Sequence, residues 1–385
     1  MLQRLFYIAS LAGLILLAGA CSSSDSPPTS IFDGPTTTPR PISSGTLADL
    51  EEVLADIYDN VNASVVNIQF SGGTSSGGFQ DFNSQGLASG FVWDKKGHIV
   101  TNEHVVIVGD SLVVTFHDGF SAPAKIIGTD RDSDLAVIKV DVPEERLFPI
   151  EVADSTRLNV GRLVAAIGNP FGLAGTMTVG FVSALGRVLP VRTDSPQGGI
   201  YSIPDVIQTD ASINPGNSGG VLVDSDGLLV GVPSAIISPL QVSAGLGFAI
   251  PSVIVGKVVP ALIDDGEYRH SWLGIRVLTV NPGIAEALDL DGGTRGAMIL
   301  ELTPGSPAER AGLVGSQRLA TINGTEIRVG GDVVIAIDGQ TINSTDDLIT
   351  HLARYTSVNQ TITILILRDR QEQTIEVTLG ARPSF

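Results

Sequence analysis

Residues 208–220 read QTDASINPGNSGG and set Ser218 among glycines on both sides. Glycine accepts the backbone angles of a tight turn, so this stretch can project Ser218 and aim the N–H groups of Gly216 and Ser218 at one spot. A hydroxyl becomes a useful nucleophile only beside a base, and the base needs a third group to fix its tautomer. Taken alone, the stretch fits a plain glycine turn between two strands equally well.

Two upstream segments supply candidates for the base and for the third group that orients it. Residues 101–106 read TNEHVV and place His104 at the end of a predicted strand, and residues 133–137 read SDLAV and place Asp134 at the start of another. A lone histidine is usually structural, and a lone aspartate at a strand start is usually a turn residue. The chain order His, Asp, Ser nevertheless matches chymotrypsin-type triads rather than those of subtilisins or α/β-hydrolases.

Together these segments resemble the HtrA/Deg family of trypsin-like serine proteases. The segments GFV at 90–92, IGNPFGL at 167–173 and GFAIP at 247–251 also stand in the order typical of that family. The resemblance covers residues 47–385 and implies a mainly β fold, with a chymotrypsin-like double six-stranded β-barrel followed by a PDZ domain.

The resemblance also implies roles for individual residues. Ser218 would be the nucleophile, His104 the general base and then acid, and Asp134 the residue that orients the imidazole. The N–H groups of Gly216 and Ser218 would form the oxyanion hole. The range 187–204 corresponds to the family's sensor loop, and its composition predicts a polar, flexible loop.

The specificity pocket of the family would be lined here by Ile213, Ile236 and Ile237. Such an apolar, shallow pocket would reject lysine and arginine and accept small aliphatic side chains. The alternative is that these isoleucines are ordinary barrel core.

Three C-terminal segments resemble a bacterial PDZ domain: WLGI at 272–275, GSPAERAGL at 305–313 and GDVVIAIDG at 331–339. A PDZ groove binds an extended peptide by strand addition and captures its terminal carboxylate with backbone N–H groups. Leu273, Gly274 and Ile275 would form that carboxylate-binding loop. The opposite wall would be a helix that begins after Ser344, which has Asp347 three residues on as in a capping box. The range 316–329 is an insertion relative to many PDZ domains.

Composition favours a globular, turn-rich protein of two or three domains. The 385 residues include 44 glycines and are 43% hydrophobic. About a dozen short β-rich runs follow a predicted helix at 47–61, and helices are expected at 251–263, 306–311 and 345–355. The formal net charge of −18 argues against nucleic-acid binding and is most simply explained by solubility.

The N-terminus has the pattern of a secretion signal. A short basic start and an apolar stretch lead to AGAC at 18–21, which resembles a bacterial lipobox with Cys21 as the lipidated residue. An uncleaved anchor and ordinary cleavage with a free thiol are the alternatives. The domain boundaries expected are a signal peptide at 1–20, Cys21 with a flexible linker at 21–46, a protease domain at 47–266 and a PDZ domain at 267–383.

The sequence therefore predicts an exported, ATP-independent serine endopeptidase that degrades misfolded or unfolded proteins at the cell envelope or in the periplasm. Its expected partners are such substrates, C-terminal peptides at the PDZ domain, and a membrane that carries the lipid anchor. The resemblance implies a homotrimer. We expect no metal or nucleotide cofactor, because no HExxH, paired CxxC or phosphate-loop motif occurs. A peptide-binding chaperone with a silent protease domain is the alternative function.

Overall fold

The computed structural model describes residues 46–71, 85–107, 109, 111–169, 175–192, 200–214, 216–234 and 245–383. The predicted signal peptide, Cys21 and the linker to residue 45 lie outside these ranges. The chain divides into a unit that ends at Ala48 and a compact unit from Asp49 to Phe385. Among the described residues, no helix combines the length and apolar composition needed to cross a membrane.

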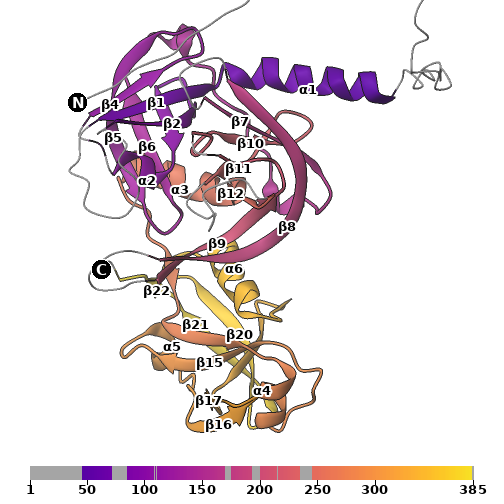
Figure 1. Ribbon diagram of the computed structural model, residues 1–385. Coiled ribbons are helices and arrows are strands. Elements are labelled where there is room, and N and C mark those ends of the chain that lie inside the picture. Colours follow the sequence, from indigo (N-terminus) through magenta and orange to yellow (C-terminus); the bar gives the residue numbers. More distant parts are fainter. Residues whose placement is uncertain are drawn as a thin grey trace, which may run out of the picture. The chain divides into compact units, whose positions relative to one another are not determined.

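The first element is helix α1, Thr46–Asn62, close to the helix predicted at 47–61 (Figure 1). Its last turns bury Ile57 and Val61. Between them, the hydroxyl of Tyr58 donates a 2.7 Å hydrogen bond to the carbonyl of Gly175, just before strand β8. The C-terminal part of α1 is thus tied to the second of two barrels.

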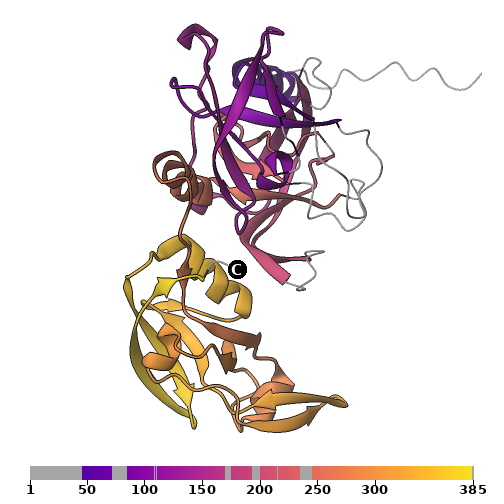
Figure 2. The ribbon, with the colours of Figure 1, turned by 90° about the vertical axis from the view of Figure 1, so that its left-hand side faces the viewer.

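The first barrel, drawn in purple shades in Figure 2, is closed by six strands in the order β1-β2-β3-β6-β5-β4. They are β1 Val65–Ser71, β2 Gln85–Val92, β3 His98–Thr101, β4 Ser111–Thr115, β5 Ser121–Asp130 and β6 Leu135–Val140. All neighbours in the barrel are antiparallel. A short helix, α2 Glu103–Val106, follows β3.

The second barrel repeats this arrangement in the order β10-β11-β12-β9-β8-β7. Its strands are β7 Leu163–Gly168, β8 Thr176–Arg192, β9 Ile200–Thr209, β10 Val221–Val223, β11 Leu229–Pro233 and β12 Gly247–Pro251. Two 3₁₀ turns, Glu144–Arg146 and Ser155–Arg157, lie on the connection between the barrels. The prediction of a double six-stranded β-barrel is confirmed.

Strand β6 shows how sequence alternation builds two cores at once. Successive side chains of a strand point to opposite faces. Ala136 and Ile138 pack inside the first barrel, whereas Leu135 and Val137 join a second cluster that contains residues of both barrels. Phe91, from the first barrel, is fully buried in that shared cluster. Burial on both faces explains why β6 reads as an almost unbroken apolar run.

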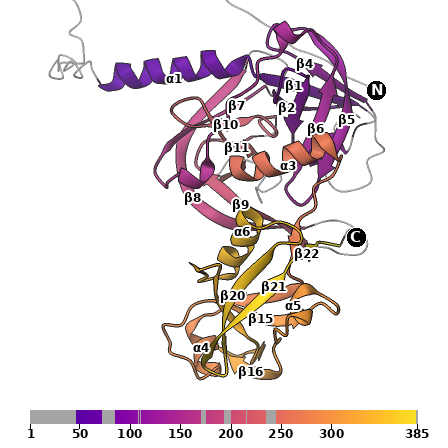
Figure 3. The same cartoon turned by 180° about the vertical axis from the view of Figure 1, so that it is seen from behind.

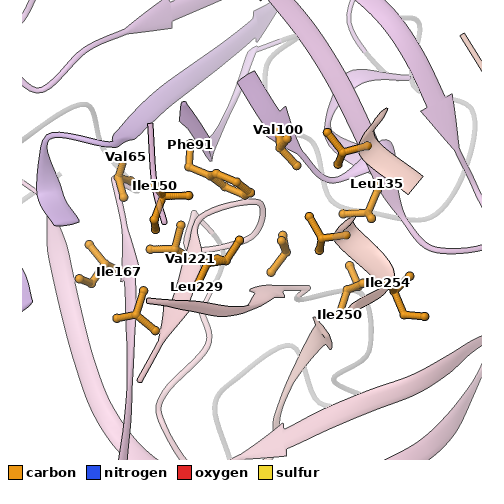
Figure 4. Close-up of a cluster of buried hydrophobic side chains, with 14 of the residues drawn as sticks. Val65, Phe91, Val100, Leu135, Ile150, Ile167, Val221, Leu229, Ile250 and Ile254 are labelled. Atoms are coloured by element: carbon orange, nitrogen blue, oxygen red, sulfur yellow. The ribbon is translucent and has the colours of Figure 1, made fainter. Parts of the chain in front are cut away.

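Figure 4 shows the shared cluster at the junction of the barrels, with Val100 and Leu135 opposite Val221 and Ile250. Helix α3, Ser252–Asp264, covers it and packs against β5, β6 and β11 (Figure 3). The helix matches the prediction for 251–263. This continuous core fixes the two barrels against each other.

The hairpin of β8 and β9 corrects one sequence-based expectation. The two strands remain paired as far as Arg192 and Ile200, so the range 187–204 is not a loop at either end. The reason is a cross-strand pair of apolar residues, Leu189 and Ile203, of which Ile203 is fully buried. Residues 193–199 lie outside the described ranges.

The C-terminal domain is built on a sheet in the order β14-β15-β18-β20-β21, with β19 paired to β18. Its elements are β13 Ser271–Trp272, β14 Ile275–Thr279, α4 Pro282–Ala287, β15 Ala297–Leu302, α5 Pro307–Arg310, β18 Val333–Ile337, β19 Gln340–Thr341, α6 Thr345–Tyr355, β20 Thr361–Arg368, β21 Gln371–Thr378 and β22 Gly380–Ala381. Ser344 caps α6 by accepting a hydrogen bond from the N–H of Asp347, as the sequence predicted.

The insertion at 316–329 forms a separate antiparallel hairpin of β16, Arg318–Ile322, and β17, Thr325–Val329. Its turn residues Asn323 and Gly324 both have positive φ angles, 51° and 80°. These are the angles that a two-residue hairpin turn needs.

Candidate active site

His104 and Asp134 meet at one end of the first barrel. The Nδ1 atom of His104, on α2, lies 2.8 Å from Oδ1 and 3.0 Å from Oδ2 of Asp134. The backbone N–H of His104 also donates to Oδ1, at 3.2 Å. Asp134 is 1% exposed, whereas the side chain of His104 is 25% exposed. The imidazole is therefore held through Nδ1, and its side chain remains partly exposed.

The conformation of Asp134 comes from the turn that joins β5 to β6. Its φ angle is +54°, and its own carbonyl accepts a 2.9 Å hydrogen bond from the side-chain amide of Asn102. A non-glycine residue in the left-handed region persists only where its surroundings hold it. Asn102 immediately precedes α2, so one side chain links the segment of His104 to the turn of Asp134.

A residue missed by the sequence reasoning completes this group. The hydroxyl of Ser234, just after β11 of the second barrel, donates a 2.7 Å hydrogen bond to Oδ2 of Asp134. Ser234 is 1% exposed. The only sequence signal was a small hydroxyl residue after a buried strand, which says nothing about a partner in the other barrel.

Ser218 lies in the glycine turn of the second barrel and is 4% exposed. Its carbonyl accepts a 3.0 Å hydrogen bond from the N–H of Ser89 on β2, and the N–H of Gly219 donates to the carbonyl of Pro233 at 3.0 Å. Gly219 has φ of +80°, and a Cβ atom there would lie 2.3 Å from the carbonyl oxygen of Ser89. The turn therefore needs glycine both for its backbone angle and for its close approach to the first barrel.

A second carboxyl group borders this site. Burial raises the pKa of Glu103, the residue before His104, and the negative charge of Asp134 raises it further. Arg131 and His104 offset part of this effect. The surroundings of the histidine thus disfavour a second full negative charge next to Asp134.

The remaining protease residues singled out from the sequence are only partly described. Gly216 is described and has a φ angle of +100°. Ile213 is buried and packs in the interior cluster of the second barrel. Ile236 and Ile237 lie outside the described residues. The oxyanion hole and the specificity pocket stay predictions.

The predicted carboxylate-binding loop lies at the start of β14, the first strand of the PDZ sheet. Gly274 has φ of +79°, and its carbonyl accepts a 2.9 Å hydrogen bond from the N–H of Thr303. The three loop residues border a groove of about 270 Å³ between β14 and α6. Its wall includes Leu348, Ile349 and Leu352 of α6 and, from β9, Ser202 and Pro204. The groove therefore joins the peptide-binding elements to a protease strand.

Comparisons with known proteins agree with both parts of this architecture. Residues 88–232 match the family described as trypsin-like peptidase domain, and residues 271–379 match the PDZ domain family. The chain is 42% identical over 300 residues to the chloroplastic Protease Do-like 1 of Arabidopsis thaliana, covering 78% of this chain and 64% of that protein. It is 39% identical over 298 residues to a probable periplasmic serine endoprotease DegP-like of Bartonella henselae, covering 77% of this chain and 54% of that protein. The chain thus spans between about half and two thirds of the length of these two relatives.

Solved structures match over a larger share of their own length. The HtrA-type protease AlgW with tripeptide superposes with a TM-score of 0.66 at 32% identity, covering 86% of this chain and 98% of that one. A serine endoprotease from Yersinia pestis gives a TM-score of 0.56 at 28% identity, with 86% and 98% covered. A trypsin-like peptidase domain followed by a PDZ domain, together with the match to AlgW over nearly its whole length, shows that the chain belongs to the HtrA family of serine proteases.

Proposed function

We propose that this chain is a serine-type endopeptidase in which Ser218 attacks the peptide carbonyl. His104 accepts the proton of the Ser218 hydroxyl and then donates it to the leaving amine. Asp134 holds the imidazole through Nδ1 and stabilises its charged form. Water, deprotonated by the same histidine, releases the acyl group from Ser218. The N–H groups of Gly216 and Ser218 stabilise the negative charge on the carbonyl oxygen.

The observation that carries this proposal is the pairing of His104 with a buried, well-supported Asp134. Each oxygen of that carboxylate accepts hydrogen bonds, at 2.8 Å from His104 and 2.7 Å from Ser234. A carboxylate supported in this way restricts the imidazole to the tautomer with the proton on Nδ1. The other ring nitrogen is then free of its proton, as a general base requires.

The test is covalent labelling of the purified full-length chain with a fluorophosphonate probe. We expect one adduct, mapped to Ser218 by mass spectrometry, and cleavage of casein by the same preparation. Ser218→Ala and His104→Ala should abolish both, whereas His117→Ala, which changes an exposed histidine, should leave both intact. Wild-type protein that neither reacts nor cleaves, even with heat or an added peptide, would rule the activity out and favour a peptide-binding chaperone.

The PDZ contacts support a regulated enzyme. Arg354, on α6, forms a bidentate ion pair with Asp205 on β9. Thr350 of the same helix donates a 3.4 Å hydrogen bond to the carbonyl of Gly186 in β8. Because α6 is also a wall of the peptide groove, a peptide that shifts α6 acts directly on this hairpin. We propose that C-terminal peptides regulate cleavage by this route and through loop ordering.

The relatives and the N-terminal sequence support a proposal for the natural setting. Several relatives are described as probable periplasmic proteases, which supports work outside the cytoplasm. We propose that the substrates are misfolded or unfolded proteins and that their cleavage needs no ATP. We propose a lipid anchor at Cys21 and a homotrimer. Mass spectrometry of the mature N-terminus tests the anchor, and light scattering of the detergent-solubilised chain tests the trimer.

A further inference from the structure

A serine outside the proposed triad connects the first barrel to the turn of Ser218. Ser89, on β2, is completely buried. Its hydroxyl donates a 2.5 Å hydrogen bond to the carbonyl of Gly216 and accepts one of 2.7 Å from the N–H of Asn169. Both partners belong to the second barrel, so the Ser89 side chain bridges the two barrels beneath the active site.

The backbone of Ser89 strengthens this connection. Its N–H donates to the carbonyl of Ser218 at 3.0 Å, and its carbonyl accepts a 2.7 Å hydrogen bond from the hydroxyl of Thr101. One residue of β2 thus fixes the carbonyl groups of both Gly216 and Ser218. These are the two residues whose N–H groups are the proposed oxyanion donors.

Gly216 needs such a restraint more than most residues. Glycine has few steric limits on its backbone angles, and Gly216 has a φ angle of +100°. A peptide plane on either side of it can rotate at little steric cost, and rotation would turn its N–H away from the substrate. The Gly216 carbonyl lies in the peptide plane on the C-terminal side of the residue, so a buried hydrogen bond to it fixes that plane and thereby limits the conformations open to the adjoining N–H.

We propose that the Ser89 hydroxyl is a positioning residue that holds Gly216 in the conformation in which its N–H faces the oxyanion. The inference rests on the proposed endopeptidase activity. Without the hydroxyl, the Gly216 carbonyl and the Asn169 N–H are both left buried without this partner. The turn can satisfy them only by moving, and movement there disorders the oxyanion hole.

Ser252 provides a matched control. It is 1% exposed, its hydroxyl donates to the carbonyl of Ala153 at 2.6 Å, and it accepts from the N–H of Ser155 at 3.2 Å. This hydrogen-bonding pattern copies that of Ser89, but at the start of α3 and away from His104 and Ser218. Ser89→Ala and Ser252→Ala therefore remove the same chemistry at two buried sites.

The experiment compares these variants in the full-length chain with a fluorogenic peptide built on a mapped casein cleavage site. Complete loss of one oxyanion donor costs about 10²–10³ in kcat in related enzymes, so we expect Ser89→Ala to lower kcat by about tenfold to a hundredfold, with KM within about twofold. The rate of fluorophosphonate labelling should fall by a similar factor. Ser252→Ala should lose similar thermal stability but keep kcat. Ser89→Cys, which retains a weak donor, should lie between wild type and Ser89→Ala.

The inference is overturned if Ser89→Ala loses stability like Ser252→Ala but keeps the wild-type kcat, or if both variants lose kcat equally. If Ser89→Ala does not fold, Ser89→Cys decides, and wild-type kcat in that variant counts against the proposal. If the wild-type chain neither reacts with the fluorophosphonate nor cleaves the peptide, the proposed function itself is wrong, and this inference is wrong with it.

Discussion

Ser234 donates a hydrogen bond to Oδ2 of Asp134 from the opposite barrel, at 2.7 Å. The carboxylate is thus held by the second barrel while it holds His104 in the first. This arrangement makes the orientation of the histidine depend on the packing of the barrels.

Ser234→Ala should lower kcat by about tenfold to a hundredfold, because a hydrogen bond to a charged group contributes about 1.5–3 kcal/mol. KM should change little, since Ser234 contacts the orienting residue and not the substrate. Steady-state kinetics on the fluorogenic peptide measure both. Ser316→Ala, which removes a buried hydroxyl in the PDZ domain, serves as the control and should retain the wild-type kcat.

The ion pair of Asp205 and Arg354 should stabilise the contact of α6 with β9. Asp205 is wholly buried, so Arg354→Ala leaves its carboxylate without a partner and should lower the free energy of unfolding by about 3–5 kcal/mol. Replacing both residues, as Asp205→Asn with Arg354→Gln, should recover much of that loss. Urea titrations measure each variant. Arg370→Ala breaks an exposed pair with Asp289 and should cost less than about 1 kcal/mol.

Gly274→Ala should abolish binding of C-terminal peptides to the PDZ groove. The residue has φ of +79°, and an added Cβ would lie 2.2 Å from the Cβ of Ser306, so the loop must move. Gly305→Ala meets the same backbone restriction, with φ of +73°, but has nothing within 4 Å of the added Cβ. Fluorescence anisotropy with a labelled peptide ending in an apolar residue should show affinity lost only in Gly274→Ala. Equal affinities for the two variants would contradict the assignment of this loop.

His351 should make the PDZ domain less stable in acid. Burial lowers its pKa below the ordinary value of 6.5, although Asp338 offsets part of the shift. The unfolded chain therefore binds a proton more readily, and stability falls as the pH drops below that value. His351→Gln should make the slope of unfolding free energy against pH shallower by up to about 1.4 kcal/mol per pH unit. Melts of the wild type and of this variant at a series of pH values measure the difference in slope.

The sequence predicted the architecture, and it singled out the candidate site residues, because their signals are local. Glycines around Ser218 and apolar runs beside His104 and Asp134 mark turns and strand ends directly. Ser234 was missed because its partner lies 100 residues away in the sequence, and no residue pattern near Ser234 predicts that contact. Ser89 escaped notice for the same reason, although it immediately precedes a segment typical of the family.

The structure differs from the sequence-based predictions at two further places, and both differences have physical causes. The Asn-Gly dipeptide at 323–324, flanked by alternating residues, is a strong hairpin signal that could have predicted β16 and β17. The ends of the range 187–204 looked like loop because proline and arginine interrupt the apolar residues there. Cross-strand pairing of Leu189 with Ile203 outweighs that local composition.

The apolar cluster shared by the two barrels has a consequence for synthesis of the enzyme. A growing chain that ends at β6 already contains His104 and Asp134, but neither Ser218 nor the hydroxyl that supports the aspartate. Reactivity can arise only after the later strands have closed and docked through Val221, Leu229 and Ile250. Because the site needs residues from both barrels, the growing chain cannot cleave itself or neighbouring proteins until folding is nearly finished.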